Sequence, residues 1–188
     1  MKRFLLFTAA AVTLLSVFFI ASCASLKADE NYEVPEPKNM KAPPPVLTEL
    51  PVVDYKGAGI KYEVESMLLH KFLVLYDESA SGQYCARLTD ESSVAELKVR
   101  FPAGTYECLL NEKANDNAHA AFYVYLDGIP YRVYPSDPPL GSWELTTRVP
   151  IYFTIDEPRT ILIQIQANSK NRLGETGMSL DYIQFVKR

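Results

Sequence analysis

Two stretches of the sequence alternate strictly between apolar and polar residues, and this alternation constrains the fold more than any other feature. The stretch VAELKVRF, residues 94–101, places its apolar side chains at every second position and charged side chains between them. The stretch TILIQIQA, residues 160–167, repeats the pattern with glutamines on the polar side. Successive side chains of a strand point to opposite faces of a sheet, so each stretch predicts a strand with one buried face.

Other strand-like stretches predict that the whole folded part is a β-sheet structure. The segments AGTYECLL, AAFYVYLDG, VPIYFTI and MSLDYIQFV are separated by the turn-forming sequences PAG, LDG, PSDPPLG and IDEP. No segment carries a helical apolar period longer than about two turns. We therefore predict one all-β domain over residues 59–188, a sandwich in preference to a barrel.

The first residues are typical of an exported lipoprotein. Lys2 and Arg3 precede a long apolar run that ends in IASC at Cys23. The run is about 17 residues, near the lower limit for a membrane-spanning helix, and IASC resembles the lipobox that is cut before a lipid-bearing cysteine. We therefore expect a signal peptide over 1–22 and a fatty-acylated Cys23 that anchors the chain to the cell envelope. Ala24 in place of Asp favours the outer membrane, on its periplasmic or surface face.

Residues 23–58 are predicted to be a proline-rich linker, because VPEPK, APPPV and LPVV lack apolar periodicity.

Removing Lys2 and Arg3 changes the formal charge from −4 to −6. An acidic chain without a basic run argues against nucleic acid as a partner. The two histidines lie outside any HExxH motif, and the chain has no GxSxG or glycine-rich phosphate loop, so we expect no enzyme.

The two remaining cysteines, Cys85 and Cys108, are candidates for a disulfide if the protein is exported. Both lie in predicted strands, so a bond requires them to be spatial neighbours. Two buried free thiols are the alternative.

The stretch YEVES places Glu63 and Glu65 one residue apart. On a strand both carboxylates would point to the same face, where they repel each other. The pair is therefore either a solvated acidic edge or part of a metal site.

Several landmarks in order resemble the carbohydrate-binding modules of families six and thirty-five. These are YEVES, FPAGTYECLLNEKAN, VYLDG, GSW, RTILIQI and MSLDYIQFV, spread over residues 60–188. The resemblance implies a galactose-binding-like jelly-roll sandwich. It also implies a structural calcium bound by Glu63, Glu65 and Asp181, and hard oxygen ligands suit this ion.

The resemblance implies a sugar site in loops at one end of the sandwich, where aromatic rings stack on sugars and amides bind hydroxyls. Trp143 is the expected stacking platform, unless it anchors its loop. Tyr84, or instead Tyr76, is a second candidate. Asn168 and Asn171 are the candidate amides, and turn-forming asparagines are an equally good interpretation of both.

Departures from the family pattern leave the ligand open. The loop around the tryptophan is rich in proline, and Arg172 lies where a simpler loop is usual. An acidic glycan that contacts Arg172 or Arg148 is therefore an alternative to a neutral sugar. The first functional hypothesis is a membrane-tethered lipoprotein that binds carbohydrate, and the second is an envelope module that binds another protein.

Overall fold

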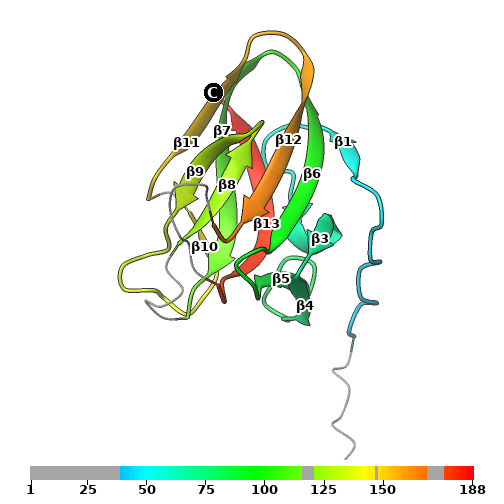
Figure 1. Ribbon diagram of the computed structural model, residues 1–188, viewed down its shortest axis with the longest axis vertical. Helices are drawn as coiled ribbons and strands as arrows, with labels where there is room; N and C mark the ends of the chain where they lie inside the picture. Colours follow the sequence, from blue (N-terminus) through cyan, green and yellow to red (C-terminus); the bar gives the residue numbers. More distant parts are fainter. Residues whose placement is uncertain (1–38, 116–120, 147, 169–175) are drawn as a thin grey trace, which may run out of the picture. The chain divides into compact units, whose positions relative to one another are not determined.

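The strands form two sheets that pack face to face (Figure 1). The computed structural model describes residues 39–115, 121–146, 148–168 and 176–188. In chain order the elements are β1 (Val52–Asp54), β2 (Tyr62–Glu63), the 3₁₀ helix η1 (Val64–Ser66), β3 (Leu68–His70), β4 (Phe72–Tyr76), β5 (Tyr84–Leu88), β6 (Val94–Phe101), β7 (Gly104–Lys113), β8 (Phe122–Leu126), β9 (Ile129–Val133), β10 (Glu144–Leu145), β11 (Ile151–Ile155), β12 (Arg159–Gln166) and β13 (Ser179–Lys187).

The first sheet has the order β1-β6-β12-β8-β9, and β3 also pairs with β6. The second sheet has the order β10-β7-β13-β5-β4, with β11 on β7 and β2 on β13. Strand β1 runs parallel to β6, whereas the long ladders β6–β12 and β7–β13 are antiparallel. This is the predicted all-β sandwich.

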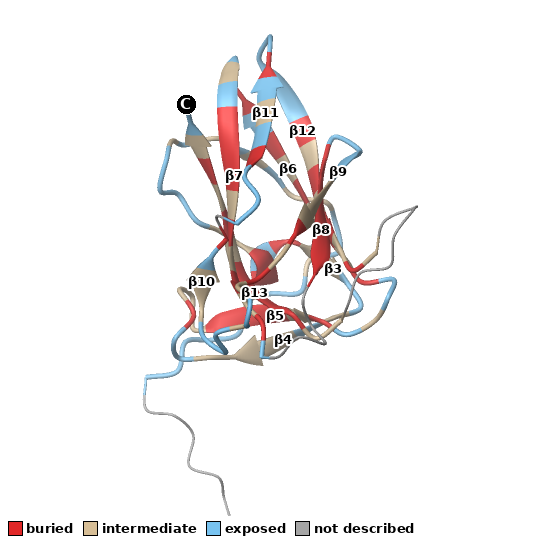
Figure 2. Cartoon of the chain, turned by 90° about the vertical axis from the view of Figure 1, so that its left-hand side faces the viewer, coloured by how far each residue is buried: buried red, intermediate tan, exposed pale blue. Residues whose placement is uncertain are grey.

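The core lies between the two sheets, and the alternation seen in the sequence selects its residues. Every second residue of β6 and β12 is buried, as predicted (Figure 2). Strands β7 and β13 supply the facing layer of the second sheet. The largest of these buried side chains include Phe101, Ile161, Ile163, Tyr106, Leu110 and Phe185.

The predicted linker ends earlier than expected, because its last part belongs to the fold. Val52–Asp54 pairs with β6, and the following Tyr55 stacks on Phe101 at 5.5 Å between ring centroids. Further upstream, the Lys41 backbone amide donates to Gln83 Oε1 at 2.8 Å. The compact unit accordingly runs from Met40 to Arg188. The fold therefore includes residues upstream of the boundary expected at residue 59, since prolines prevent a helix but leave an edge strand possible.

The stretch YEVES is not one continuous strand. Strand β2 ends at Glu63, and residues 64–66 form the helix η1 before β3 begins in the other sheet. This crossing buries Val64 completely. The two glutamates therefore come together through a turn between sheets, and not through strand alternation as predicted.

The predicted disulfide is absent, because Cys85 and Cys108 are both free and buried. Strand β13 lies between their strands β5 and β7. Two strand spacings put at least about 10 Å between the cysteines, whereas a disulfide needs Cα atoms within about 7 Å. Burial raises the pKa of the Cys85 thiol to about 11, so it is unreactive at neutral pH.

Cys23 and the predicted signal peptide lie outside the described residues. Within the described ranges, no helix is long and apolar enough to cross a bilayer.

Candidate functional site

Three carboxyl groups from two distant parts of the chain meet beside β13, and we call Glu63, Glu65 and Asp181 the carboxylate cluster. The backbone amide of Ser81 donates to both oxygens of Asp181, at 3.0 and 3.1 Å. The Asn111 amide donates to the same carboxylate at 2.8 Å. The Ser81 hydroxyl lies 2.7 Å from both Glu63 oxygens. The loop between β4 and β5 thus covers the cluster.

Glu65 is the least satisfied member of the cluster. Its side chain is 5% exposed, and its Oε2 atom has no hydrogen-bond partner. Burial, followed by repulsion from Glu63 and Asp181, raises the pKa of Glu65 to about 8. Burial and repulsion from Asp181 also raise the pKa of Glu63. The cluster therefore accommodates its negative charge poorly and would gain from a proton or a cation.

The space around Glu65 is small. A Cβ atom on Gly82 would lie 2.8 Å from Glu65 Oε1, so the loop backbone closely approaches the carboxylate. A cavity of about 140 Å³ separates Glu65 from the proline-rich segment 44–47. This is well below the volume of about 300 Å³ typical of the smallest ligand pockets. Among the described residues no group of three or more His, Cys, Asp or Glu forms an assembled metal centre. The cluster is therefore three interacting carboxyls, of which Glu65 alone lines this small and otherwise apolar cavity.

Trp143 lies half-buried against the same loop. Its indole nitrogen donates to Ser79 Oγ at 3.0 Å, and the Lys113 ammonium lies 4.6 Å from the ring centroid. Lys113 also forms an ion pair with Asp77 at the start of the loop. The ring thus anchors the loop that covers the carboxylate cluster, and Lys113 occupies one of its faces.

Among the other predicted sugar-binding residues, Tyr84 is excluded because its ring is buried and its hydroxyl donates to the Lys41 carbonyl at 2.9 Å. A buried ring cannot stack on a sugar. The Asn168 amide donates to the Glu91 carbonyl at 3.0 Å, which holds two end loops together. Asn171 and Arg172 lie outside the described residues.

A cleft of about 630 Å³ opens at the end of the sandwich that carries Trp143, and we call it the end cleft. Most of its lining comes from the loop between β9 and β11, which the sequence singled out around the tryptophan. Its walls combine the aromatic ring of Tyr134 and the apolar side chain of Leu140 with polar groups. The polar lining residues are Glu112, Ser136, Asp137, Glu144, Thr146 and Arg148.

Glu112 is buried at the inner wall of the end cleft. It accepts a hydrogen bond from Thr146 Oγ1 at 3.3 Å, and its Oε2 atom has no donor. Burial, with repulsion from the neighbouring Glu144, raises the pKa of Glu112 to about 8. When protonated, Glu112 can donate a hydrogen bond to Glu144. Glu144 is itself held by the Ser136 backbone amide at 2.8 Å. The cleft therefore presents two adjacent carboxyls.

Sequence reasoning missed Glu112, although a signal for it was present. In β7 the inward positions run Tyr106, Cys108, Leu110 and then Glu112, so a charged residue occupies a core position. Ser81 gave no comparable signal, because only the folded loop brings its amide to Asp181.

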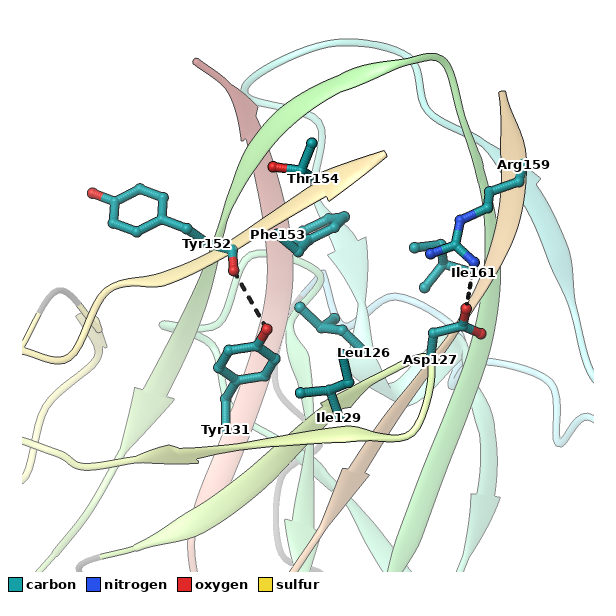
Figure 3. Close-up of a pocket in the computed structure, with 9 residues that line it drawn as sticks. All are labelled: Leu126, Asp127, Ile129, Tyr131, Tyr152, Phe153, Thr154, Arg159 and Ile161. Atoms are coloured by element: carbon teal, nitrogen blue, oxygen red, sulfur yellow. Dashed lines mark hydrogen bonds and ion pairs between the residues drawn. The ribbon is translucent and has the colours of Figure 1, made fainter. Parts of the chain in front are cut away.

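A second cavity of about 360 Å³ lies between β9, β11 and the start of β12, toward the opposite end (Figure 3). Apolar core residues form its floor, among them Phe153 and Ile161. Arg159 and Asp127 pair at 2.8 Å at its rim, so neither charge is free for a ligand. This cavity is smaller and less polar than the end cleft.

No protein-family model and no curated protein matches the sequence. Solved structures do match. A native family 35 carbohydrate-binding module from Clostridium thermocellum aligns with a TM-score of 0.55 and 14% identity, over 69% of this chain and 98% of that module. A CBM35 from Paenibacillus barcinonensis aligns with a TM-score of 0.52 and 17% identity, over 69% of this chain and all of that one.

The Podospora anserina GH26-CBM35 β-(1,4)-mannanase aligns with a TM-score of 0.56 and 14% identity. The match covers 71% of this chain and 28% of the mannanase. Such low identities establish the fold alone. The chain has the jelly-roll β-sandwich fold of these carbohydrate-binding modules.

Proposed function

We propose that this protein is a non-catalytic carbohydrate-binding module and that the end cleft is its ligand site. The observation that carries the proposal is the end cleft itself, built by the loops of a carbohydrate-binding-module fold. Its volume lies within the range of small-ligand pockets, and it combines an aromatic ring with hydroxyl and carboxyl groups. Such groups match the apolar faces and the hydroxyls of a sugar.

The arrangement of the two carboxyls supports binding in preference to catalysis. Glycoside hydrolysis uses two carboxyl groups about 5 Å or more apart, with the scissile bond between them. In the end cleft Glu112 and Glu144 interact directly with each other. A pair in direct contact leaves no room for a glycosidic bond between them.

The test is a glycan array probed with the chain from residue 24, with matched Tyr134→Ala and Tyr152→Ala variants. Tyr134 lines the end cleft, whereas Tyr152 lines the opposite cavity. We expect glycan binding that Tyr134→Ala weakens by about tenfold, equivalent to about 1.4 kcal/mol, and that Tyr152→Ala leaves unchanged. A well-folded protein that binds no glycan would contradict the proposal.

We also propose that the carboxylate cluster holds a structural calcium ion. Glu63, Glu65 and Asp181 supply hard oxygen ligands, and the buried, unpartnered Glu65 Oε2 fits the need for a cation. Calcium would relieve the mutual repulsion of the three carboxylates and would link β2 to β13. It would raise thermal stability by mass action, which melting curves in calcium and in chelator would measure.

We propose that a lipid on Cys23 tethers the module to the envelope, most readily at the outer membrane. A Cys23→Ser variant should move from the membrane fraction to the soluble fraction. Retention of this variant in the membrane would contradict the lipid anchor.

A protein partner is the second candidate function, and exposed apolar side chains favour it. Half of the large apolar residues exposed in the described chain lie between positions 129 and 152, namely Ile129, Leu140, Leu145, Val149 and Tyr152. Two of them, Ile129 and Tyr152, line the same cavity at the end opposite the cleft, and neighbouring exposed apolar side chains are typical of an interaction surface. Crosslinking in intact cells, with an Ile129→Ser and Tyr152→Ser double variant as control, would test this alternative.

A further inference from the structure

The end cleft carries more negative than positive groups. Among its described lining residues, Glu112, Glu144 and Asp137 are acidic, and Arg148 is the basic one. Arg148 already has partners, since its Nη1 atom donates to the Pro135 carbonyl at 2.8 Å and its Nη2 atom lies 3.9 Å from Asp137. The cleft therefore has little to offer a ligand carboxylate, which argues against the acidic glycan suggested by the sequence.

A second arginine lies close to the end cleft without lining it. The Arg132 guanidinium lies 4.6 Å from the centroid of the Tyr134 ring, and the Arg148 guanidinium lies 5.7 Å from it. Arg132 thus contacts the aromatic wall, although its buried Nε atom has no hydrogen-bond partner. The carboxyls at the inner wall have no basic partner among the interactions of the described residues.

Glu112 points to the kind of group that completes the site. It is fully buried, it belongs to the lining of the cleft, and its Oε2 atom has no hydrogen-bond donor. A buried acceptor without a donor costs free energy, and a buried charge without a counter-charge costs more. A sugar hydroxyl could supply the donor only. A protonated amine supplies both the donor and the positive charge, and it has three N–H groups to share between Glu112 and Glu144.

We propose that the end cleft recognises an amino sugar through its protonated amine, held between Glu112 and Glu144, while Tyr134 and Leu140 contact the sugar ring. This rests on the proposed function and names its ligand class. The amine replaces the direct hydrogen bond between the two carboxyls, whose side chains move apart to admit the nitrogen, and the proton of Glu112 is released to solvent. Bidentate, charge-assisted hydrogen bonds of this kind are stronger than those to a neutral hydroxyl.

The experiment is calorimetric titration of the full mature chain with three oligosaccharides of equal length. These are a glucosamine oligomer, its N-acetylated form and a uronic acid oligomer, each measured at about pH 6, where an aliphatic amine is protonated. We expect the glucosamine oligomer to bind at least about tenfold more tightly than the N-acetylated form, because acetylation removes the charge. The uronic acid oligomer should bind most weakly.

Two variants locate the effect. Glu112→Gln keeps the side-chain shape but removes the charge, and it should abolish the preference for the glucosamine oligomer. Glu107→Gln is the matched control, a buried glutamate on the same strand whose partner is Arg188 and which does not line the cleft. If Glu112→Gln does not fold, Glu144→Gln provides the same test.

The outcomes separate the two proposals. Failure of every glycan to bind would overturn the proposed function and this inference together. Binding of neutral or uronic oligomers that equals or exceeds glucosamine binding, and that Glu112→Gln does not change, would overturn the amine assignment alone. Tight binding of calcium or magnesium in the cleft, lost in Glu112→Gln, would also overturn it by assigning a metal instead.

Discussion

The carboxylate cluster and the end cleft both bury a glutamate whose pKa is raised to about 8, yet the spaces beside the two glutamates differ. In both, burial is the main cause. Around Glu65 the loop backbone closes in, and the adjacent cavity measures about 140 Å³. Beside Glu112 the space opens to about 630 Å³. A buried carboxyl alone therefore does not identify its ligand, and our proposals of an ion for Glu65 and an organic molecule for Glu112 rest on the different spaces beside them.

The largest expected effect on stability comes from removing the Asp181 carboxylate, which accepts hydrogen bonds from two amides. Asp181→Ala leaves the Ser81 backbone amide and the Asn111 side-chain amide without their acceptor. It should lower the free energy of unfolding by about 3 kcal/mol. It should also abolish stabilisation by calcium. Urea denaturation with and without calcium measures both effects, and Glu157→Ala, at an exposed position, is the control. Undiminished stabilisation of Asp181→Ala by calcium would place the ion elsewhere.

Both sites should make the stability of the protein depend on pH even without a ligand. Because the pKa values of Glu65 and Glu112 are raised from 4.5 to about 8, the folded state binds more protons than the unfolded state between these values. Without calcium, the stability that these bound protons contribute to the folded state is complete below about pH 4.5 and is lost as the pH rises through about 8. We expect each carboxyl to contribute about 2 kcal/mol or more to the loss.

Calcium should change only one part of this profile. When calcium occupies the carboxylate cluster, it competes with protons there. The contribution of Glu65 to the pH dependence of stability should then disappear, while that of Glu112 remains. Urea titrations across the pH range, repeated with Glu65→Gln and Glu112→Gln, measure the two shares. An identical profile with and without calcium would count against the calcium site.

The close approach of Gly82 to Glu65 gives a sharper test of the cluster. Gly82→Ala places a methyl group 2.8 Å from Glu65 Oε1, so the carboxylate must shift. We expect a loss of about 1–2 kcal/mol and a weaker response to calcium. In a Glu65→Ala background the same substitution should cost little, because the contact is gone. An equal cost in both backgrounds would mean that the loop, and not the carboxylate, resists the methyl group.

The sequence predicted the strands well because alternation reports burial directly, as in β6 and β12. It predicted that Glu63, Glu65 and Asp181 belong together, but not how, because η1 between the two glutamates depends on a crossing between sheets. The failed Cys85–Cys108 pairing has the same origin. Strand order is a long-range property, and no local pattern indicated that β13 lies between the two cysteines.

The smallest expected effect is that of replacing Trp143. The measurement shows whether this residue belongs to the carboxylate cluster or to the end cleft. The sequence suggested a sugar-stacking platform, whereas in the structure its indole donates to Ser79 and contacts Lys113. If its role is to anchor the loop over the carboxylate cluster, Trp143→Phe should cost about 1 kcal/mol through the lost hydrogen bond. It should weaken the calcium response and leave glycan affinity unchanged. Loss of glycan affinity with an unchanged calcium response would instead make the ring part of the sugar site, and would extend that site from the end cleft across β10.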